Sequence, residues 1–203
     1  MLNGSPSLLL SMTDGVTLGS ARAIRWAAVL FVTVLTSAAA QISIPLPFTP
    51  VPLTLQPMVV LLGGAALGAR LGFSSQVLYL LAGLAGLPVF AASPVLPQGA
   101  LRLIGPTGGF LMAYPLAAFV TGRLAERGFD RRYLTSVAAM AAGLAIIFAS
   151  GLSWMTMQLA SVAGAQALQT ALQTGLYPFV LVDVLKLVAA GAILPGAWKL
   201  LGR

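Results

Sequence analysis

Residues 177–194 read YPFVLVDVLKLVAAGAIL, an apolar run of the minimum length for a transmembrane helix. Asp183 and Lys186 lie near its middle, three positions apart, so a helix places both on one face. A charge at the centre of a bilayer costs at least ~2.5 kcal/mol even on the most lenient scale. We therefore expect the pair to face the interior of a helix bundle. There it either holds helices together as an internal ion pair or, as we favour, binds a ligand.

The composition is that of an integral membrane protein. Of the 203 residues, 59% are hydrophobic and 7% are charged, whereas soluble domains carry about 25% charged residues. The net charge of +7 comes from basic residues at the ends of apolar runs, a pattern typical of membrane topology and not of a nucleic-acid-binding face. With no Cys, no His and four acids, we expect no metal site, no cofactor and no catalysis by this chain alone.

The hydrophobic pattern predicts an all-α bundle of six transmembrane helices. Residues 1–21 are expected to be an N-terminal cytoplasmic tail, and residues 22–203 a single transmembrane domain. The Gln-rich segment 154–175 is expected to be a polar loop whose apolar residues could form an amphipathic helix. The predicted spans are residues 26–44, 58–69, 71–87, 105–123, 133–153 and 174–197, with a tight GARLG turn (68–72) between the second and third.

The basic residues predict the orientation. If both termini are cytoplasmic, the cytoplasmic segments hold nine of the eleven bases, as expected for a multi-pass protein of the inner (cytoplasmic) membrane. Arg102 then lies on the outer side, and Lys186 lies within a span. The nine are Arg22, Arg25, Arg70, Arg123, Arg127, Arg131, Arg132, Lys199 and Arg203.

A proline-rich connection follows the first span. Residues 44–57 read IPLPFTPVPLTLQP, and proline fixes φ and lacks an N–H group, so this segment is expected to be a stiff, non-helical flap. The Gly-rich segment 105–110, GPTGGF, lacks the GK[ST] ending of a phosphate loop. Either its N–H groups meet an anion or a carbonyl, or its glycines allow close helix packing.

The charges that cytoplasmic placement does not explain point to a pocket that opens outward. Arg102 or Lys186 could meet the anionic end of a small ligand, and Asp183 could bond its polar end. The walls of this pocket are expected to be apolar and aromatic, as is typical of ligand sites, and to include Phe48, Phe90, Phe110, Tyr114 and Tyr177. The candidate substrate-binding residues are Asp183, Lys186, Arg102, Gln98, Tyr114, Phe90, Gln56 and Tyr177.

Over roughly residues 25–195 the chain resembles the BioY family, the biotin-specific substrate-binding (S) components of energy-coupling-factor (ECF) vitamin transporters, and five stretches carry the resemblance. VPLTLQ and GPTGG at this separation are the specific part of the resemblance. The five stretches are IPLPFTPVPLTLQ (44–56), GARLG (68–72), YLLAGLAGLPVF (79–90), GPTGGFLMAYPLAAFVTGRLAERG (105–128) and the YPF…D-x-x-K of residues 177–186.

The resemblance implies an S-component bundle of six helices with a biotin pocket near the extracellular face, biotin being the transported ligand and not a cofactor. It implies a gating loop over the pocket, and it implies partners: a coupling transmembrane subunit, contacted through Ala23 and Ala27, and two ABC-type ATPases. Membrane lipid completes the expected partners, and no nucleic acid is among them. The gating loop comprises Pro47, Phe48, Thr49, Pro50, Val51 and Pro52.

Two other functions stay open. A self-sufficient secondary transporter could cycle a proton on Asp183, and a homo-oligomer could compensate for the missing inverted repeat. An intramembrane lipid-modifying enzyme could use the Asp183–Lys186 pair, although the absence of His, Cys and a second membrane acid argues against it. Dependence of uptake on ATPase partners separates the first alternative from an S component.

Overall fold

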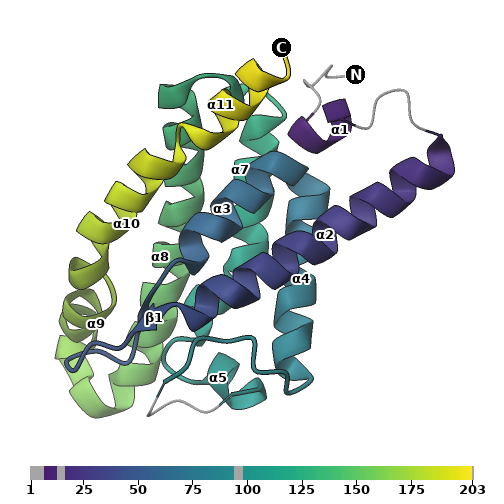
Figure 1. Ribbon diagram of the computed structural model, residues 1–203. Coiled ribbons are helices and arrows are strands. Elements are labelled where there is room, and N and C mark those ends of the chain that lie inside the picture. The colour runs from purple at the N-terminus through teal and green to yellow at the C-terminus, as the bar shows by residue number, and fades with distance from the viewer. Residues whose placement is uncertain (1–6, 13–16, 94–97, 203) are drawn as a thin grey trace.

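The computed structural model describes residues 7–12, 17–93 and 98–202, and it is a bundle of α-helices with one short antiparallel ladder (Figure 1). The helices are α1 (Leu8–Met12), α2 (Leu18–Gln41), α3 (Gln56–Leu67), α4 (Ala69–Leu84), α5 (Ala100–Ile104), α6 (Gly108–Met112), α7 (Tyr114–Ala125), α8 (Tyr133–Ala163), α9 (Ala167–Gly175), α10 (Tyr177–Ala190) and α11 (Ile193–Leu200). The 3₁₀ turns are η1 (Phe129–Arg131) and η2 (Gly164–Gln166), and the strands are β1 (Ser43–Ile44) and β2 (Leu53–Thr54).

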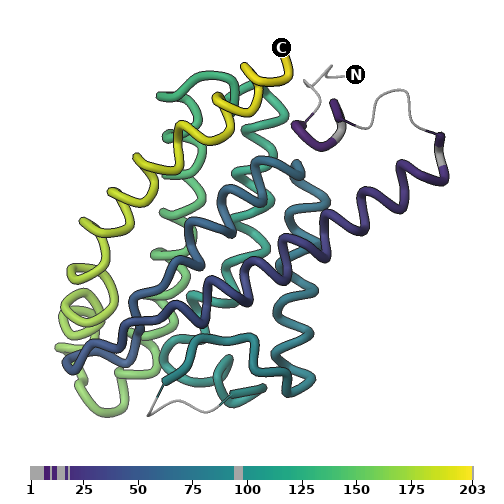
Figure 2. The backbone as a smooth tube through the Cα atoms, viewed as in Figure 1, coloured from purple at the N-terminus to yellow at the C-terminus, as the bar shows by residue number. Residues whose placement is uncertain are grey.

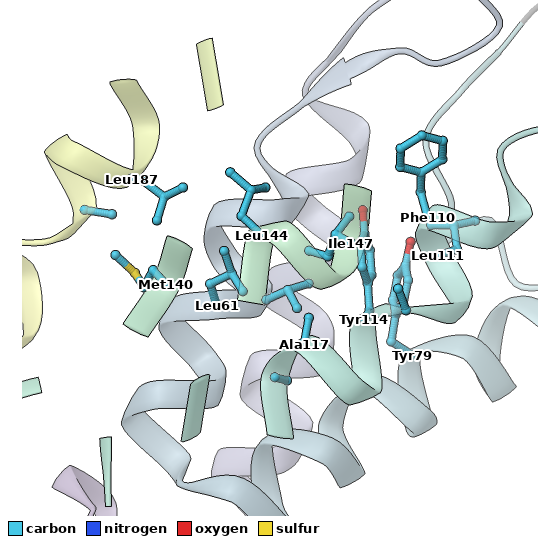
Figure 3. Close-up of a cluster of buried hydrophobic side chains, with 14 of the residues drawn as sticks. Leu61, Tyr79, Phe110, Leu111, Tyr114, Ala117, Met140, Leu144, Ile147 and Leu187 are labelled. Carbon is cyan, nitrogen blue, oxygen red and sulfur yellow. The ribbon is translucent and has the colours of Figure 1, made fainter. Parts of the chain in front are cut away.

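Helices α3, α4 and α7 pack against one another through glycine. A Cβ atom on Gly64 would lie 2.7 Å from the Cα atom of Ala118, and one on Gly72 would lie 2.8 Å from the Cα atom of Gly64. Small residues at such positions let helix backbones approach closely, which is how helices associate in a membrane. The buried side chains around this contact include Leu61, Tyr79, Tyr114, Met140, Leu144, Ile147 and Leu187 (Figure 3).

The predicted turn between the second and third spans lies at Gly68, whereas residues 69–72 of GARLG already belong to α4. Gly68 separates α3 from α4 and has φ +86°, a value that L side chains rarely adopt. The N–H group of Ala69, at the start of α4, donates to the Glu126 carboxylate at 2.9 Å. The end of α7 therefore caps α4 and fixes the angle of the turn.

Part of the segment predicted to be a cytoplasmic tail, residues 1–21, is helical. Ser7 is buried and donates from Oγ to the Leu67 carbonyl oxygen at 3.3 Å, so α1 is held against α3. Helix α2 begins at Leu18, within the predicted tail and well before the predicted span that starts at residue 26. Residues 1–6 and 13–16 of that tail lie outside the described residues.

The Gln-rich segment 154–175 is not a loop. Helix α8, which is 31 residues long, extends into this segment as far as Ala163, and α9 follows after η2. The indole Nε1 of Trp154 donates to the Gly105 carbonyl oxygen at 2.9 Å, and the Gln158 amide donates to that of Ile104. These polar side chains bond the neighbouring segment, so their polarity does not interrupt the helix.

The bundle has two chemically different ends (Figure 1). The start of α2, the α3–α4 turn, the α7–α8 connection and α11 lie at one end, whereas β1, β2, α5 and α9 lie at the other. The first set of elements carries the predicted cytoplasmic bases except Arg203, which lies outside the described residues, and α5 carries Arg102. Among the described residues, two helical stretches are long and apolar enough to cross a membrane, Gly19–Gln41 and Tyr133–Leu200.

Candidate ligand-binding site

A cavity lies at the end of the bundle opposite to the arginine-rich end. Its volume is about 70 Å³, and it is partly open to solvent. Its walls come from the proline-rich flap and from helices α3 and α5 to α10. They are Val51, Pro52, Thr54, Gln56, Pro57, Ala91, Arg102, Thr107, Phe110, Leu111, Tyr114, Ile147, Phe148, Gly175, Phe179 and Asp183.

Asp183 is the acidic group of this cavity. It is 6% exposed, on the inner face of α10, and its Oδ1 atom accepts a hydrogen bond from Lys186 Nζ at 2.8 Å. The same Nζ atom donates to the Thr54 carbonyl oxygen at 2.6 Å. Lys186 therefore lies behind Asp183 and joins α10 to β2, and it is not itself part of the cavity wall.

Arg102 is the basic group of the cavity wall. Its guanidinium is held because NH2 donates to the Ala91 carbonyl oxygen, while the buried NH1 group has no hydrogen-bond partner among the described residues. Burial lowers the pKa of Arg102 from its usual value. A buried N–H without a partner is unfavourable, so an anion bound in this cavity would satisfy it.

A hydrogen-bonded chain fixes the polar wall beside the flap. The Gln56 amide nitrogen donates to the Tyr79 hydroxyl at 2.6 Å, and that hydroxyl donates to the Val89 carbonyl oxygen at 3.3 Å. The Thr54 hydroxyl donates to Gln56 Oε1 at 3.4 Å. Figure 3 shows the side chains of Tyr79 and Tyr114 pointing the same way, and their ring centroids are 6.3 Å apart.

The proline-rich flap is closed at its base by the β1–β2 ladder, in which Ser43 pairs with Thr54. It is tied down at its tip, because the Thr49 hydroxyl donates to the Thr174 carbonyl oxygen of α9 at 2.6 Å. Val51 and Pro52 face the cavity. The other predicted gating residues, Pro47, Phe48, Thr49 and Pro50, line a separate groove that Pro52 also borders.

Besides Lys186, three predicted substrate-binding residues lie outside the cavity wall. Phe90 is buried behind it, with its ring edge-on to Tyr79 at 5.5 Å, and Gln98 is exposed and donates to the Phe90 carbonyl oxygen at 3.2 Å. Tyr177 is 64% exposed, so its predicted place in the cavity is wrong. Phe179 lines the cavity instead, since two helical positions differ by about 200° around the axis.

Some wall residues, Thr107 among them, were not predicted, whereas Phe110 lines the cavity as expected. Thr107 and Phe110 belong to GPTGGF, the segment whose role the sequence left open. A Cβ atom on Gly109 would lie 2.8 Å from the Ser150 carbonyl oxygen, and the Ser150 hydroxyl donates to the Gly109 carbonyl oxygen at 2.9 Å. Gly109 therefore allows close packing of α6 on α8, and Thr107 and Phe110 beside it line the cavity.

The model of the BioY family matches residues 12–203. The chain belongs to the BioY family. It is similar to the "Probable biotin transporter BioY" of Pyrococcus horikoshii, with 41% identity over 156 residues that cover 77% of this chain and 85% of the relative. It is also similar to the "Biotin transporter BioY" of Thermotoga maritima, with 40% identity over 154 residues that cover 76% of this chain and 83% of the relative. These relatives are membrane transporters, not enzymes.

A solved structure has the same fold as this BioY-family chain. It is described as the S-component for biotin from an ECF-type ABC transporter, and the TM-score is 0.76. The likeness covers 91% of this chain and 95% of the other at 23% identity, so it shows the helical fold. The prediction of an ECF S-component-like all-α fold is confirmed at this level.

Proposed function

We propose that this chain captures biotin in the membrane and acts as the substrate-specific subunit of an ECF transporter. The observation that carries the proposal is that Asp183 and Arg102 line one apolar cavity in a member of a family whose named relatives are biotin transporters. The cavity thus offers an acid, a base and apolar walls to one small molecule.

Biotin matches this wall group by group. Its carboxylate would accept from the unpaired NH1 of Arg102, and its ureido N–H groups would donate to Asp183. The thioether ring and the alkyl chain would pack against Phe110, Tyr114 and Phe179. Gln56 and Thr107 add polar groups along the same wall.

We place the chain in the inner membrane as a multi-pass protein with both termini cytoplasmic. The six passages would be α2, α3, α4, α6 with α7, α8, and α10 with α11. Helix α3 has 12 residues and is therefore about 18 Å long, less than the roughly 30 Å hydrocarbon core. Most of its residues are buried, which supports a place inside the bundle rather than against lipid.

The transport partners follow from the same assignment. We expect a coupling transmembrane subunit and two ABC-type ATPases to drive release, because the sequence contains no nucleotide-binding motif. Ala23 and Ala27 are exposed on α2, so a coupling helix could approach this small-residue face closely. Nothing in the described residues favours a self-sufficient proton-coupled transporter.

The test is a calorimetric titration of biotin into the detergent-solubilised protein without partners. Asp183→Asn should weaken binding more than tenfold, since truncating a buried charged hydrogen bond costs about 2–5 kcal/mol. Asp130→Asn, the same change at the opposite end of the bundle, should leave the affinity unchanged. A folded wild type that does not bind biotin would refute the assignment.

A further inference from the structure

A second surface feature lies on the outside of the bundle, at the arginine-rich end and between α2, α4 and α7. We call it the arginine groove. It is lined by Arg25, Arg70, Leu71, Phe119, Arg123 and Glu126. The start of α2 projects away from the other helices (Figure 2).

Three arginines and one glutamate line the arginine groove, so basic side chains outnumber acidic ones. Arg25 and Arg70 are exposed, and their guanidinium groups make no hydrogen bond or ion pair with the described residues. Arg123 pairs with Glu126 at 3.1 Å, and the other oxygen of Glu126 accepts the N–H group of Ala69 at 2.9 Å. The one acid of the groove is thus occupied, and the guanidinium groups of Arg25 and Arg70 remain for an external anion.

An apolar track continues the groove along the bundle. A neighbouring hollow shares Arg70 and Phe119 with the groove and extends along Phe73 and Leu116. Phe73 is about one helical turn beyond Arg70 in α4, and Leu116 about one turn before Phe119 in α7, so the track leads away from the arginine-rich end. The rings of Phe73 and Phe119 meet edge to face with centroids 6.5 Å apart.

This surface is separate from the face expected to contact the coupling subunit. Arg25 lies about 200° around the α2 axis from Ala23 and Ala27. It is also at the opposite end of the bundle from the cavity that holds Asp183. A ligand in the groove would therefore compete with neither biotin nor a helix packed on Ala23 and Ala27.

We propose that the arginine groove binds an anionic phospholipid. The phosphate lies between Arg25 and Arg70, whose planar guanidinium groups match phosphate oxygens in pairs, and an acyl chain follows Phe73 and Phe119. A basic pocket between helices at a membrane interface, continued by an apolar track, has the shape and charge of such a lipid. The inference goes beyond biotin transport and does not depend on it.

The experiment is native mass spectrometry of the detergent-solubilised protein with phosphatidylglycerol or phosphatidylcholine of identical acyl chains. The wild type should retain phosphatidylglycerol preferentially. The double variant Arg25→Gln with Arg70→Gln should lower the retention of phosphatidylglycerol roughly tenfold or more, because each basic side chain near the membrane surface strengthens the attraction to an anionic lipid. The matched control, Arg127→Gln with Arg132→Gln, removes the same charge from exposed positions outside the groove and should keep the preference.

Further arms of the experiment separate the lipid from other anions and partners. Soluble glycerol phosphate should not displace the lipid, and Phe73→Ser should weaken lipid retention. Equal retention of the two lipids by the wild type, equal loss in both double variants, or displacement by glycerol phosphate would overturn the proposal. So would a groove variant that keeps the lipid but loses co-purification with the coupling subunit, since that would identify a protein-docking surface.

Discussion

The ammonium group of Lys186 joins two segments that are far apart in sequence, donating to the Thr54 carbonyl oxygen at 2.6 Å and to Asp183 at 2.8 Å. Thr54 belongs to the β2 strand that closes the flap, and Asp183 lines the cavity. The Lys186 side chain therefore links the position of α10, which carries Asp183, to the position of the flap.

Replacing Lys186 should loosen the flap as well as weaken biotin binding. Lys186→Met leaves Asp183 buried without its partner, a loss that costs about 3–5 kcal/mol in buried ion pairs. Hydrogen exchange at the backbone of residues 43–54 should become faster, and Lys186→Arg should restore part of the protection. Unchanged exchange in Lys186→Met would show that the Thr54 contact does not hold the flap.

Arg102 should contribute to affinity only when the ligand carries a carboxylate. Arg102→Gln should weaken biotin binding tenfold or more, because a charge-assisted hydrogen bond is lost. The same variant should bind biotin amide about as well as the wild type does. Calorimetry with both ligands measures this difference, and equal losses for the two would mean that Arg102 acts through the fold.

The tie between the flap tip and α9 should control how long biotin stays bound. Thr49→Val removes the donor to the Thr174 carbonyl oxygen, a bond worth about 0.5–1.5 kcal/mol. Biotin should dissociate roughly twofold to tenfold faster in a stopped-flow measurement. Thr170→Val, the same substitution on α9, serves as the control and should leave the rate unchanged. A wild-type rate in Thr49→Val would contradict a gating role.

Bulky residues at the exposed α2 positions should separate binding from assembly. Ala23→Leu with Ala27→Leu should leave biotin affinity intact, because neither residue lies near the cavity. Co-purification with the coupling subunit should fall at least severalfold, since a small-residue interface cannot accept larger side chains without separating the helices. Loss of biotin binding in this variant would assign the pair to the fold instead.

Asp130, in the α7–α8 connection, should make stability depend on pH. Burial raises the pKa of Asp130, although the Trp198 indole donates to it at 2.6 Å and Arg131 is nearby. The folded state thus favours the protonated form, so its contribution to stability is full below the ordinary pKa of about 3.9 and falls as the pH rises through the raised pKa. The unfolding temperature of the wild type minus that of Asp130→Asn should decrease over this range. A difference that increases with pH would refute the sign.

The sequence predicted those site residues whose charge is unfavourable in an apolar segment or departs from the distribution of the other bases. Asp183 stood out because charge is rare in an apolar run, and Arg102 because it broke the distribution of bases; both line the cavity. Tyr177 and Phe179 are both aromatic residues at the start of α10, and only the rotation of that helix in the bundle places one in the cavity and the other outside. The length of α8 was missed because Trp154 and Gln158 find hydrogen-bond partners on another segment.

The sequence by itself determined that this is a helical membrane protein of the BioY family, with its bases gathered at one end, because composition and motif order need no contacts to be recognised. The tertiary structure decided that Lys186 lies behind the cavity, that Gly109 of GPTGGF allows close packing, and that Arg25, Arg70 and Arg123 converge in one groove. These relationships join residues that are distant in the chain. They depend on how the helices rotate and cross, which local pattern does not specify.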